Sequence, residues 1–305
     1  MDPVMLQIGP IALRWYGLLI ALGVLGGSVW SLREARRRGM DENALLDLAP
    51  WLVLAGLVGA RAVFVITSPS AFFGPGGRPL DAFAVWQGGI SIHGGILGIL
   101  IAVLLLAPRK GMAPWSVMDV LTPIGALGII GGRIGNVMNG SDTGGRTTDW
   151  PIGVAWPEPG TDTFGAVGRW IFGPELWQYG PPVCRTVPAG EACVVHLTPL
   201  YGMLVGIALI PILIWAFRRT QAPGWVFAQF ALWYSLLRSV IEEPFRDNPL
   251  FWPVYENLQA GVGIFTLTQL VSIPIILVAG YALLTIDPDR DQRRQRLHQR
   301  AAKRR

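Results

Sequence analysis

Charged residues are scarce in this chain. Of its 305 residues only 15% are Asp, Glu, Lys or Arg, whereas 51% are hydrophobic. A soluble domain of ordinary composition carries roughly a quarter charged residues, so this deficit excludes such a domain. The composition instead predicts an integral membrane protein.

Histidine and cysteine are also scarce, with three and two residues. The histidines, His93, His196 and His298, lie far apart, and no spacing resembles a pair of metal ligands. The sequence also lacks a P-loop and a Gly-x-Ser-x-Gly motif. We therefore predict no metal and no cofactor. Cys184 and Cys193 either form a disulfide in an oxidising compartment or carry unpaired thiols.

Long apolar runs are what the chain has in abundance. About 20 apolar residues in helical conformation cross a bilayer. Seven runs reach that length, at about 10–32, 47–67, 88–107, 117–138, 197–217, 224–241 and 262–286. We therefore predict an all-α integral membrane protein with seven transmembrane helices.

Positive charge predicts the orientation of these spans. Lys and Arg gather after alternate runs, at Arg33–Arg38, Arg109–Lys110, Arg218–Arg219 and Arg290–Arg305. By the positive-inside rule this side is cytoplasmic, so the N-terminus is outside and the C-terminus is inside. We interpret the basic tail, 287–305, as a cytoplasmic topology determinant that touches anionic lipid, and we predict no nucleic-acid partner.

Residues 1–286 are predicted to form one polytopic membrane domain. It has a long external insertion, about 139–196, between the fourth and fifth spans. Unstructured loops of that length are uncommon in compact proteins. We therefore expect the insertion to form a small folded cap.

Four arginines, Arg14, Arg61, Arg133 and Arg238, lie in or beside apolar runs. A cation in hydrocarbon is costly, so it usually pairs with an anion or lines a polar cavity. The pattern predicts a protein built around a negatively charged group at membrane depth. A lipid phosphate is the obvious candidate.

Arg133 belongs to the densest polar motif of the chain, with Asn136 and Asn139 at spacings of three and six residues. On a helix these side chains form one polar patch. Arg makes bidentate contacts to phosphate and Asn can hold hydroxyl groups. The alternative is a structural polar cluster between helices.

Arg238 and Glu242 are four residues apart and can form either a structural ion pair or part of a site. Arg61 has no acid within one helical turn, so its expected partner is another helix or a lipid. His93 lies between glycine pairs at the start of the third run, where it can transfer protons or only cap a helix. Tyr16 lies at the outer end of the first run, where aromatic residues often anchor at the interface.

Several further segments accompany these residues in a fixed order. They are Arg14-Trp15-Tyr16-Gly17, Gly59-Ala60-Arg61, Gly88–Gly95, Gly132-Arg133-Ile134-Gly135-Asn136 through Asn139-Gly140, Gly145-Arg146, His196 with Pro199-Leu200-Tyr201, Arg238 with Glu242, and Gln269–Pro274. With this set the chain resembles the bacterial prolipoprotein diacylglyceryl transferases over about residues 8–285.

The resemblance implies an enzyme that acts in the first step of bacterial lipoprotein maturation. It would transfer the diacylglyceryl group of phosphatidylglycerol to the lipobox cysteine thiol of a prolipoprotein signal peptide. The products would be a thioether and glycerol 1-phosphate. The implied location is the bacterial cytoplasmic (inner) membrane, with the lipid bilayer as a further partner.

The resemblance also implies roles for single residues. The catalytic set is His93, Arg133, Arg238 and Tyr16, and the substrate-binding set is Arg133, Asn136, Asn139, Arg61, Gly145, Arg146 and Glu242. His93 would be the base that takes the thiol proton, or would hold the head group while another group takes it.

Three positions depart from the family pattern. Gln87 stands where members often have Asp, Asp142 lies in a longer loop that lacks the common Glu, and Gly202 replaces a frequent Glu. A lipid transporter or scramblase is the competing class, because it also needs cations inside the membrane. It differs in making no chemical product.

Overall fold

The computed structural model describes residues 4–8, 11–74, 76–85, 89, 91–139, 144–156 and 193–288. The chain divides into two compact units. One comprises the residues up to Ser31 together with the chain from Leu121 onward, and the other comprises Leu32–Val120. The boundaries fall inside two long helices, α1 (Trp15–Arg37) and α5 (Pro114–Asn139).

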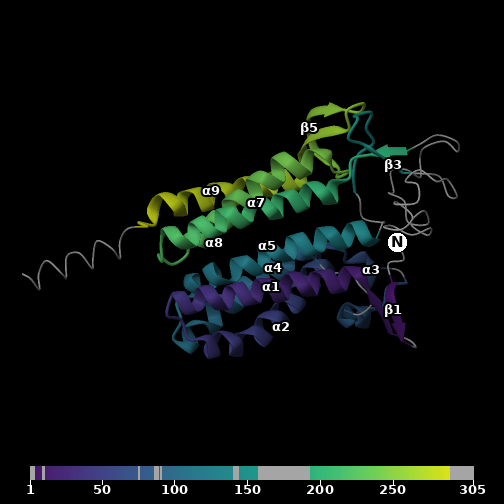
Figure 1. Cartoon of the computed structure of the whole chain (residues 1–305). Coiled ribbons are helices and arrows are strands. Elements are labelled where there is room, and N and C mark those ends of the chain that lie inside the picture. The colour runs from purple at the N-terminus through teal and green to yellow at the C-terminus, as the bar shows by residue number, and fades with distance from the viewer. Residues whose placement is uncertain are drawn as a thin grey trace, which may run out of the picture. The chain divides into compact units, whose positions relative to one another are not determined.

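In the part of the first unit that the structure describes, long helices are combined with three two-stranded antiparallel sheets. Besides its parts of α1 and α5 it contains β1 (Val4–Ile8), β2 (Ile11–Arg14), β3 (Val154–Trp156), β4 (Cys193–Val195), α7 (Thr198–Arg219), α8 (Trp225–Leu237), the π-helical turn η6 (Arg238–Glu242), the 3-10 turn η7 (Glu243–Phe245), β5 (Leu250–Asn257), β6 (Val262–Thr266) and α9 (Leu267–Thr285). In Figure 1 helices α7, α8 and α9 run side by side, and the β5–β6 hairpin lies at one end of them.

Helices α7 and α8 share an apolar core with α5. Leu209, Leu213, Ala216 and Val226 are fully buried there, and Ala126 of α5 packs in the same cluster. Helix α1 lies directly against α5, because a Cβ on Gly131 would overlap the carbonyl oxygen of Leu19. Small residues thus allow the two backbones to approach, as they do in membrane helix pairs.

Two of the predicted spans begin later than expected, because strands precede them. The first run was expected to be helical from residue 10, but β1 and β2 pair as a hairpin and α1 begins at Trp15. The sequence between the strands, Gly9-Pro10, is a strong turn signal. Arg14 therefore lies in β2 and is exposed. The prediction that it lies inside the first span is wrong.

The last run likewise starts with β6, and its helix begins at Leu267. A capping box fixes this start. The Thr266 hydroxyl accepts a hydrogen bond from Gln269 N, and the Gln269 side chain accepts one from Thr266 N. The helix start therefore follows cap chemistry, which an apolar count does not detect.

Among the described residues, five helices are long and apolar enough to cross a membrane: α1, α2 (Glu42–Thr67), α5, α7 and α9. This makes the chain a multi-pass membrane protein of mainly helical structure. The predicted third span forms the shorter apolar helix α4 (Ile92–Leu106), and the sixth forms α8 followed by η6. The count of seven spans stays a prediction.

Part of the predicted cap is described. Strands β3 and β4 pair there in an antiparallel sheet, with Ala155 opposite Val194. Cys193 lies in β4 and is disulfide-bonded. Cys184, Asp142 and residues 157–192 lie outside the described residues, as do Gln87 and the tail from 289. The pairing of the two cysteines and the extent of the cap stay predictions.

The second unit is built on α2 and α4. It also holds the short helix α3 (Ser70–Phe73) and the 3-10 turns η1 (Pro79–Phe83) and η3 (Pro108–Lys110). The α2 and α4 backbones touch at Gly59 and Gly94, where a Cβ on either glycine would overlap the carbonyl oxygen of the other. Arg38, which directly follows α1, forms a buried ion pair of 3.1 Å with Asp119 of α5.

Candidate active site

The candidate site of the first unit begins where α8 changes its winding. From Arg238 to Glu242 the chain forms a π-helical turn, and the N–H of Glu243 donates to the carbonyl of Arg238. A π turn places residues i+4 and i+5 near the same face, whereas an α-helix would separate them. Both Glu242 and Glu243 are consequently turned into the protein, at 1% and 0% exposure.

Glu242 is shared by three arginines. Arg133 of α5 and Arg246 each contact Oε1, the latter at 3.1 Å, and Arg238 lies 3.7 Å from Oε2. Arg133 and Arg246 are themselves mostly buried. The predicted Arg238–Glu242 pair is thus present, as one contact of a larger cluster.

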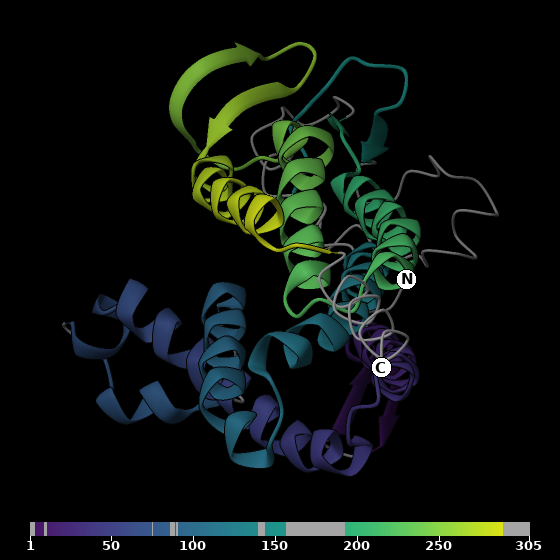
Figure 2. The same cartoon turned by 90° about the vertical axis from the view of Figure 1, so that its left-hand side faces the viewer.

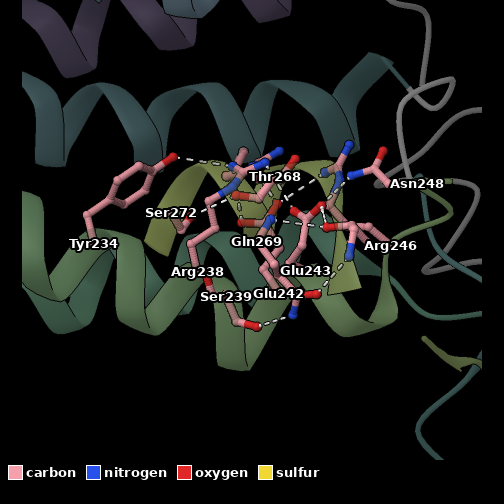
Figure 3. Close-up of polar contacts among 12 residues, drawn as sticks. Tyr234, Arg238, Ser239, Glu242, Glu243, Arg246, Asn248, Thr268, Gln269 and Ser272 are labelled. Carbon is pink, nitrogen blue, oxygen red and sulfur yellow. Dashed lines mark hydrogen bonds and ion pairs between the residues drawn. The ribbon is translucent and has the colours of Figure 1, made fainter. Parts of the chain in front are cut away.

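Glu243 holds a second set of contacts. Its Oε1 accepts hydrogen bonds from Asn248 Nδ2 at 2.7 Å and from the Thr266 hydroxyl at 2.8 Å. Its Oε2 lies 3.4 Å from Arg238 Nη2. Figure 3 shows Arg238, Glu242, Glu243 and Arg246 converging in one network at the start of α9. Arg238 also donates to the Tyr234 hydroxyl at 3.2 Å.

We call Arg133, Arg238, Arg246, Glu242 and Glu243 the arginine cluster. Among the described residues its ion pairs join three guanidinium groups to two carboxylates, which leaves one unit of positive charge. Excess charge in a buried site is costly unless an anion neutralises it. The cluster is therefore suited to bind one anionic group.

Gly202 of α7 makes room for the cluster. A Cβ at this position would collide with Arg133 Nε and would lie 2.7 Å from Glu242 Oε2. Any larger residue would have to displace the Arg133–Glu242 pair or replace it. The carboxylate of Glu242 thus occupies the space beside Gly202.

Gly145 and Arg146 tie the cap to the segment that follows the cluster. A Cβ on Gly145 would overlap the carbonyl oxygen of His196, so only glycine fits there. Arg146 N donates to Phe245 O, and Arg146 Nη2 donates to Asn248 O, both at 2.9 Å. The structure thus gives both residues structural contacts, and their predicted role in substrate binding stays a prediction.

His196 is fully buried in an aromatic box formed with Trp150, Tyr201 and Phe245. Its Nε2 lies 2.9 Å from the carbonyl oxygen of Ala260, so this nitrogen carries the proton and donates. Its Nδ1 accepts from the Tyr201 hydroxyl at 3.0 Å. Burial lowers the pKa of His196, because the charged form loses its hydration.

The other predicted residues of the first unit lie near the end of α5 or at the start of α1. Asn136 is buried in α5, three residues after Arg133. Tyr16 packs at the same end, because a Cβ on Gly135 would lie 2.8 Å from its ring. Asn139 ends α5, and its side chain lies outside the described residues.

His93 and Arg61 belong to the second unit. The His93 side chain is exposed in the first turn of α4. Arg61 is buried, and its guanidinium donates to the carbonyls of Asp81, Ala82 and Gly89, at 2.8 Å for Ala82 and 2.7 Å for Gly89. The rings of Phe64 and Phe72 lie within cation–π distance. One of the two rings, Phe72, belongs to another helix, α3, and the predicted role of Arg61 in substrate binding stays a prediction.

Sequence reasoning missed Tyr234 and Asn248 and did not assign a role to Glu243. Tyr234 lies four residues before Arg238, the spacing of helical neighbours, and this signal was available. Glu243 was not distinguishable, because its inward position depends on the π turn. Asn248 reaches Glu243 through an irregular segment that has no periodicity to interpret.

Comparisons with known proteins identify the family. The family model for prolipoprotein diacylglyceryl transferase matches residues 3–285. A relative from Thermus thermophilus, named phosphatidylglycerol–prolipoprotein diacylglyceryl transferase, is 42% identical over 95% of this chain and all of its own length. Relatives of the same name from Deinococcus radiodurans and a Thermoanaerobacter species are 41% and 32% identical, each over 93% of this chain and over 85% and 93% of their own lengths. The chain belongs to the prolipoprotein diacylglyceryl transferase family.

Proposed function

We propose that this chain transfers the diacylglyceryl group of phosphatidylglycerol to the lipobox cysteine thiol of a prolipoprotein. The products are a thioether and glycerol 1-phosphate, and the reaction is the first step of lipoprotein maturation. The observation that carries the proposal is the arginine cluster, whose single excess positive charge suits the lipid phosphate. Relatives that span nearly the whole chain carry the name of this activity.

The chemistry needs what this cluster offers. The thiolate sulfur attacks the glycerol carbon that carries the phosphate ester, and a carbon–sulfur bond forms. The carbon–oxygen bond breaks with its electron pair, so negative charge develops on the departing phosphate. Fixed cations in a site that excludes water stabilise such charge strongly. Arg133 and Arg238 are the cations we assign to this task, with Asn136 orienting the head group.

The thiol proton needs an acceptor. We assign this role to His93 because of its position between glycine pairs at the start of the third apolar run. Tyr16 is assigned to the site of the arginine cluster because it packs against Gly135 at the end of α5. We further propose seven spans in the bacterial cytoplasmic membrane, with the N-terminus outside, following the distribution of Lys and Arg.

Product analysis tests the reaction class. The purified protein is incubated with phosphatidylglycerol and a lipobox peptide, and the peptide is examined by mass spectrometry. The proposal predicts a mass gain of one diacylglyceryl group on the cysteine and one glycerol 1-phosphate released for each thioether formed. A scramblase would move labelled lipid between leaflets and leave the peptide unchanged, which would refute the transferase assignment.

The pH profile of His93→Gln tests the proton acceptor. A base must be neutral, so the wild-type rate should fall as pH drops through the pKa of the acceptor. His93→Gln should lose most activity and this low-pH decline. A variant that keeps a substantial rate and the same profile would show that His93 only holds the head group, and would leave the transferase assignment intact.

A further inference from the structure

The β5–β6 hairpin carries an apolar bulge at the end that joins α9. Leu250 pairs with Thr266 and Tyr255 with Ile264, so four residues of β5 stand opposite Phe265 alone. These four residues are Phe251, Trp252, Pro253 and Val254, and we call them the apolar bulge. Bulges of this kind change the direction in which side chains point and interrupt the regular pairing of the strands.

The apolar bulge is exposed to an extent that soluble surfaces rarely show. Phe251, Trp252 and Val254 are 60%, 67% and 65% exposed. A contiguous apolar patch of this kind usually marks an interaction site. Its proline fits an edge position, because Pro has no N–H to donate to a neighbouring strand.

The strand opposite the bulge is fixed by hydrogen bonds. Phe265, opposite the bulge, has a φ of 86°, a left-handed conformation that is unfavourable for a bulky residue. Its N–H donates to Gln269 Oε1 at 2.6 Å, and Gln269 Nε2 donates to Ser239 O at 2.8 Å. The Thr266 hydroxyl is fixed on Glu243 at 2.8 Å. The strained backbone is thus maintained by contacts from α9 and the arginine cluster.

The position of the bulge identifies what it contacts. Strand β6 passes directly into α9, a helix able to span a membrane, so a span formed by α9 places the bulge where that helix leaves hydrocarbon. Leu267 at this end of α9 is also apolar and 59% exposed. Figure 2 shows the hairpin arching away from the ends of α8 and α9. Trp and other aromatic residues concentrate at this depth of a bilayer.

Charge favours a lipid interface over an acidic partner. Residues 247–266 contain no Lys or Arg, and Glu256 of β5 is paired with Arg146. Attraction to anionic groups therefore contributes nothing to binding at the hairpin. Burial of aromatic and aliphatic side chains is the remaining driving force.

We propose that the apolar bulge inserts into the interfacial layer of the bilayer beside α9 and anchors the hairpin to the membrane surface. The opposite end of the hairpin stays in water. Its turn is tied to the cap, where Asp149 N donates to Gln259 O and Thr148 Oγ1 donates to Ala260 O, both at 2.9 Å. Leu258 in this turn is apolar and 76% exposed, which makes it a matched control position. The proposal goes beyond the transfer reaction and does not depend on it.

Site-specific fluorescence tests the proposal. Trp252→Cys and Leu258→Cys full-length proteins are labelled with a small environment-sensitive dye and reconstituted into phosphatidylcholine vesicles. The unsubstituted protein, treated with the same dye, gives the background. Groups in the interfacial layer lie about 5–10 Å into the boundary between head groups and acyl chains, so a shallow spin-labelled lipid should quench position 252 about twofold more than position 258.

The same result should hold with Val254→Cys, and adding anionic lipid should not change it. Emission at 252 and 254 that is as water-like and as weakly quenched as at 258 would overturn the proposal. Shielding that arises only after a lipobox peptide is added would overturn it as well, because the bulge would then dock the protein substrate.

Discussion

The buried arginines of the two units differ in the groups that surround their guanidinium groups. Arg61 is surrounded by carbonyl oxygens and two aromatic rings, all from a short stretch of its own unit. Arg133 and Arg238 share carboxylates with Arg246. The carbonyls bonded to Arg61 belong to the segment between residues 81 and 89, which this side chain ties to α2. Three cations on two carboxylates leave charge for a ligand.

The largest expected effect distinguishes a ligand-binding arginine from a structural one. Arg133→Ala should lower turnover on the order of 10²–10³-fold, because a charge-stabilising group is lost from the site. Arg133→Lys should recover little, since lysine lacks the planar bidentate geometry. Turnover is measured as thioether formed per enzyme, with circular dichroism as the folding control. Near-normal turnover in Arg133→Ala would remove this residue from the mechanism.

Removing a carboxylate from the cluster should destabilise the protein. Glu242→Gln leaves three guanidinium groups facing one carboxylate, and breaking a buried pair in this way costs about 3–5 kcal/mol. Glu256→Gln is the control, because its pair with Arg146 is partly exposed and such pairs contribute about 0–1 kcal/mol. Unfolding in detergent should separate the two variants clearly. Equal stability would mean that the cluster is solvated and not buried.

Adding a methyl group should perturb the cluster without removing charge. Gly202→Ala would push a Cβ against Arg133 and Glu242, and overpacking of this kind costs about 1–3 kcal/mol. We expect the loss to fall on turnover more than on folding, because the displaced groups are the ones proposed to bind the phosphate. Gly128→Ala is the control, since a Cβ there meets nothing within 4 Å. A Gly202→Ala enzyme as active as Gly128→Ala would contradict the packing of the pair.

Arg61→Ala should act on a loop and not on a ligand. Without the guanidinium, three carbonyls lose their donor, at about 1–3 kcal/mol for each buried group left unsatisfied. Amide exchange should therefore rise around residues 81–91, and Arg61→Lys should restore part of the protection. Unchanged exchange with a selective loss of lipid binding would instead make Arg61 a ligand residue.

The smallest effect is a pH dependence of stability centred on His196. Burial lowers the pKa of His196 in the folded protein, so the folded state favours the neutral imidazole. Stability is complete above the unfolded pKa of about 6.5 and falls as pH drops below it, because the unfolded chain then binds a proton that the folded chain rejects. His196→Gln should flatten this decline between pH 7 and 5. An identical slope in both proteins would assign the decline to other groups.

The sequence was sufficient to predict most long helices, because apolar length is a strong signal. It did not predict the strands before α1 and α9, since short apolar strands add to the same hydrophobic count. The start of α9 at Leu267 depends on the contacts of Thr266 and Gln269. The Thr-x-x-Gln spacing that makes them is a helix-start signal in the sequence, and a count of apolar residues does not use it.

The site was predictable where a residue type conflicts with its surroundings. Arg133 and Arg238 stand out because charge is costly among apolar residues, and Glu242 follows Arg238 at helical spacing. The inward turn of Glu243 depends on a change of winding that sequence periodicity does not reveal. The carbonyl groups that accept from Arg61 are present in every residue, so these contacts leave no signature in the sequence.

Lipid binding tests the central claim, that the excess charge of the arginine cluster holds the phosphate of the substrate. Affinity is compared for phosphatidylglycerol and for diacylglycerol, which lacks the phosphate, in the wild type and in Arg133→Gln. The account predicts that the wild type prefers phosphatidylglycerol and that this preference largely disappears in Arg133→Gln, while diacylglycerol binding is unchanged. A preference of equal size in both proteins would contradict it.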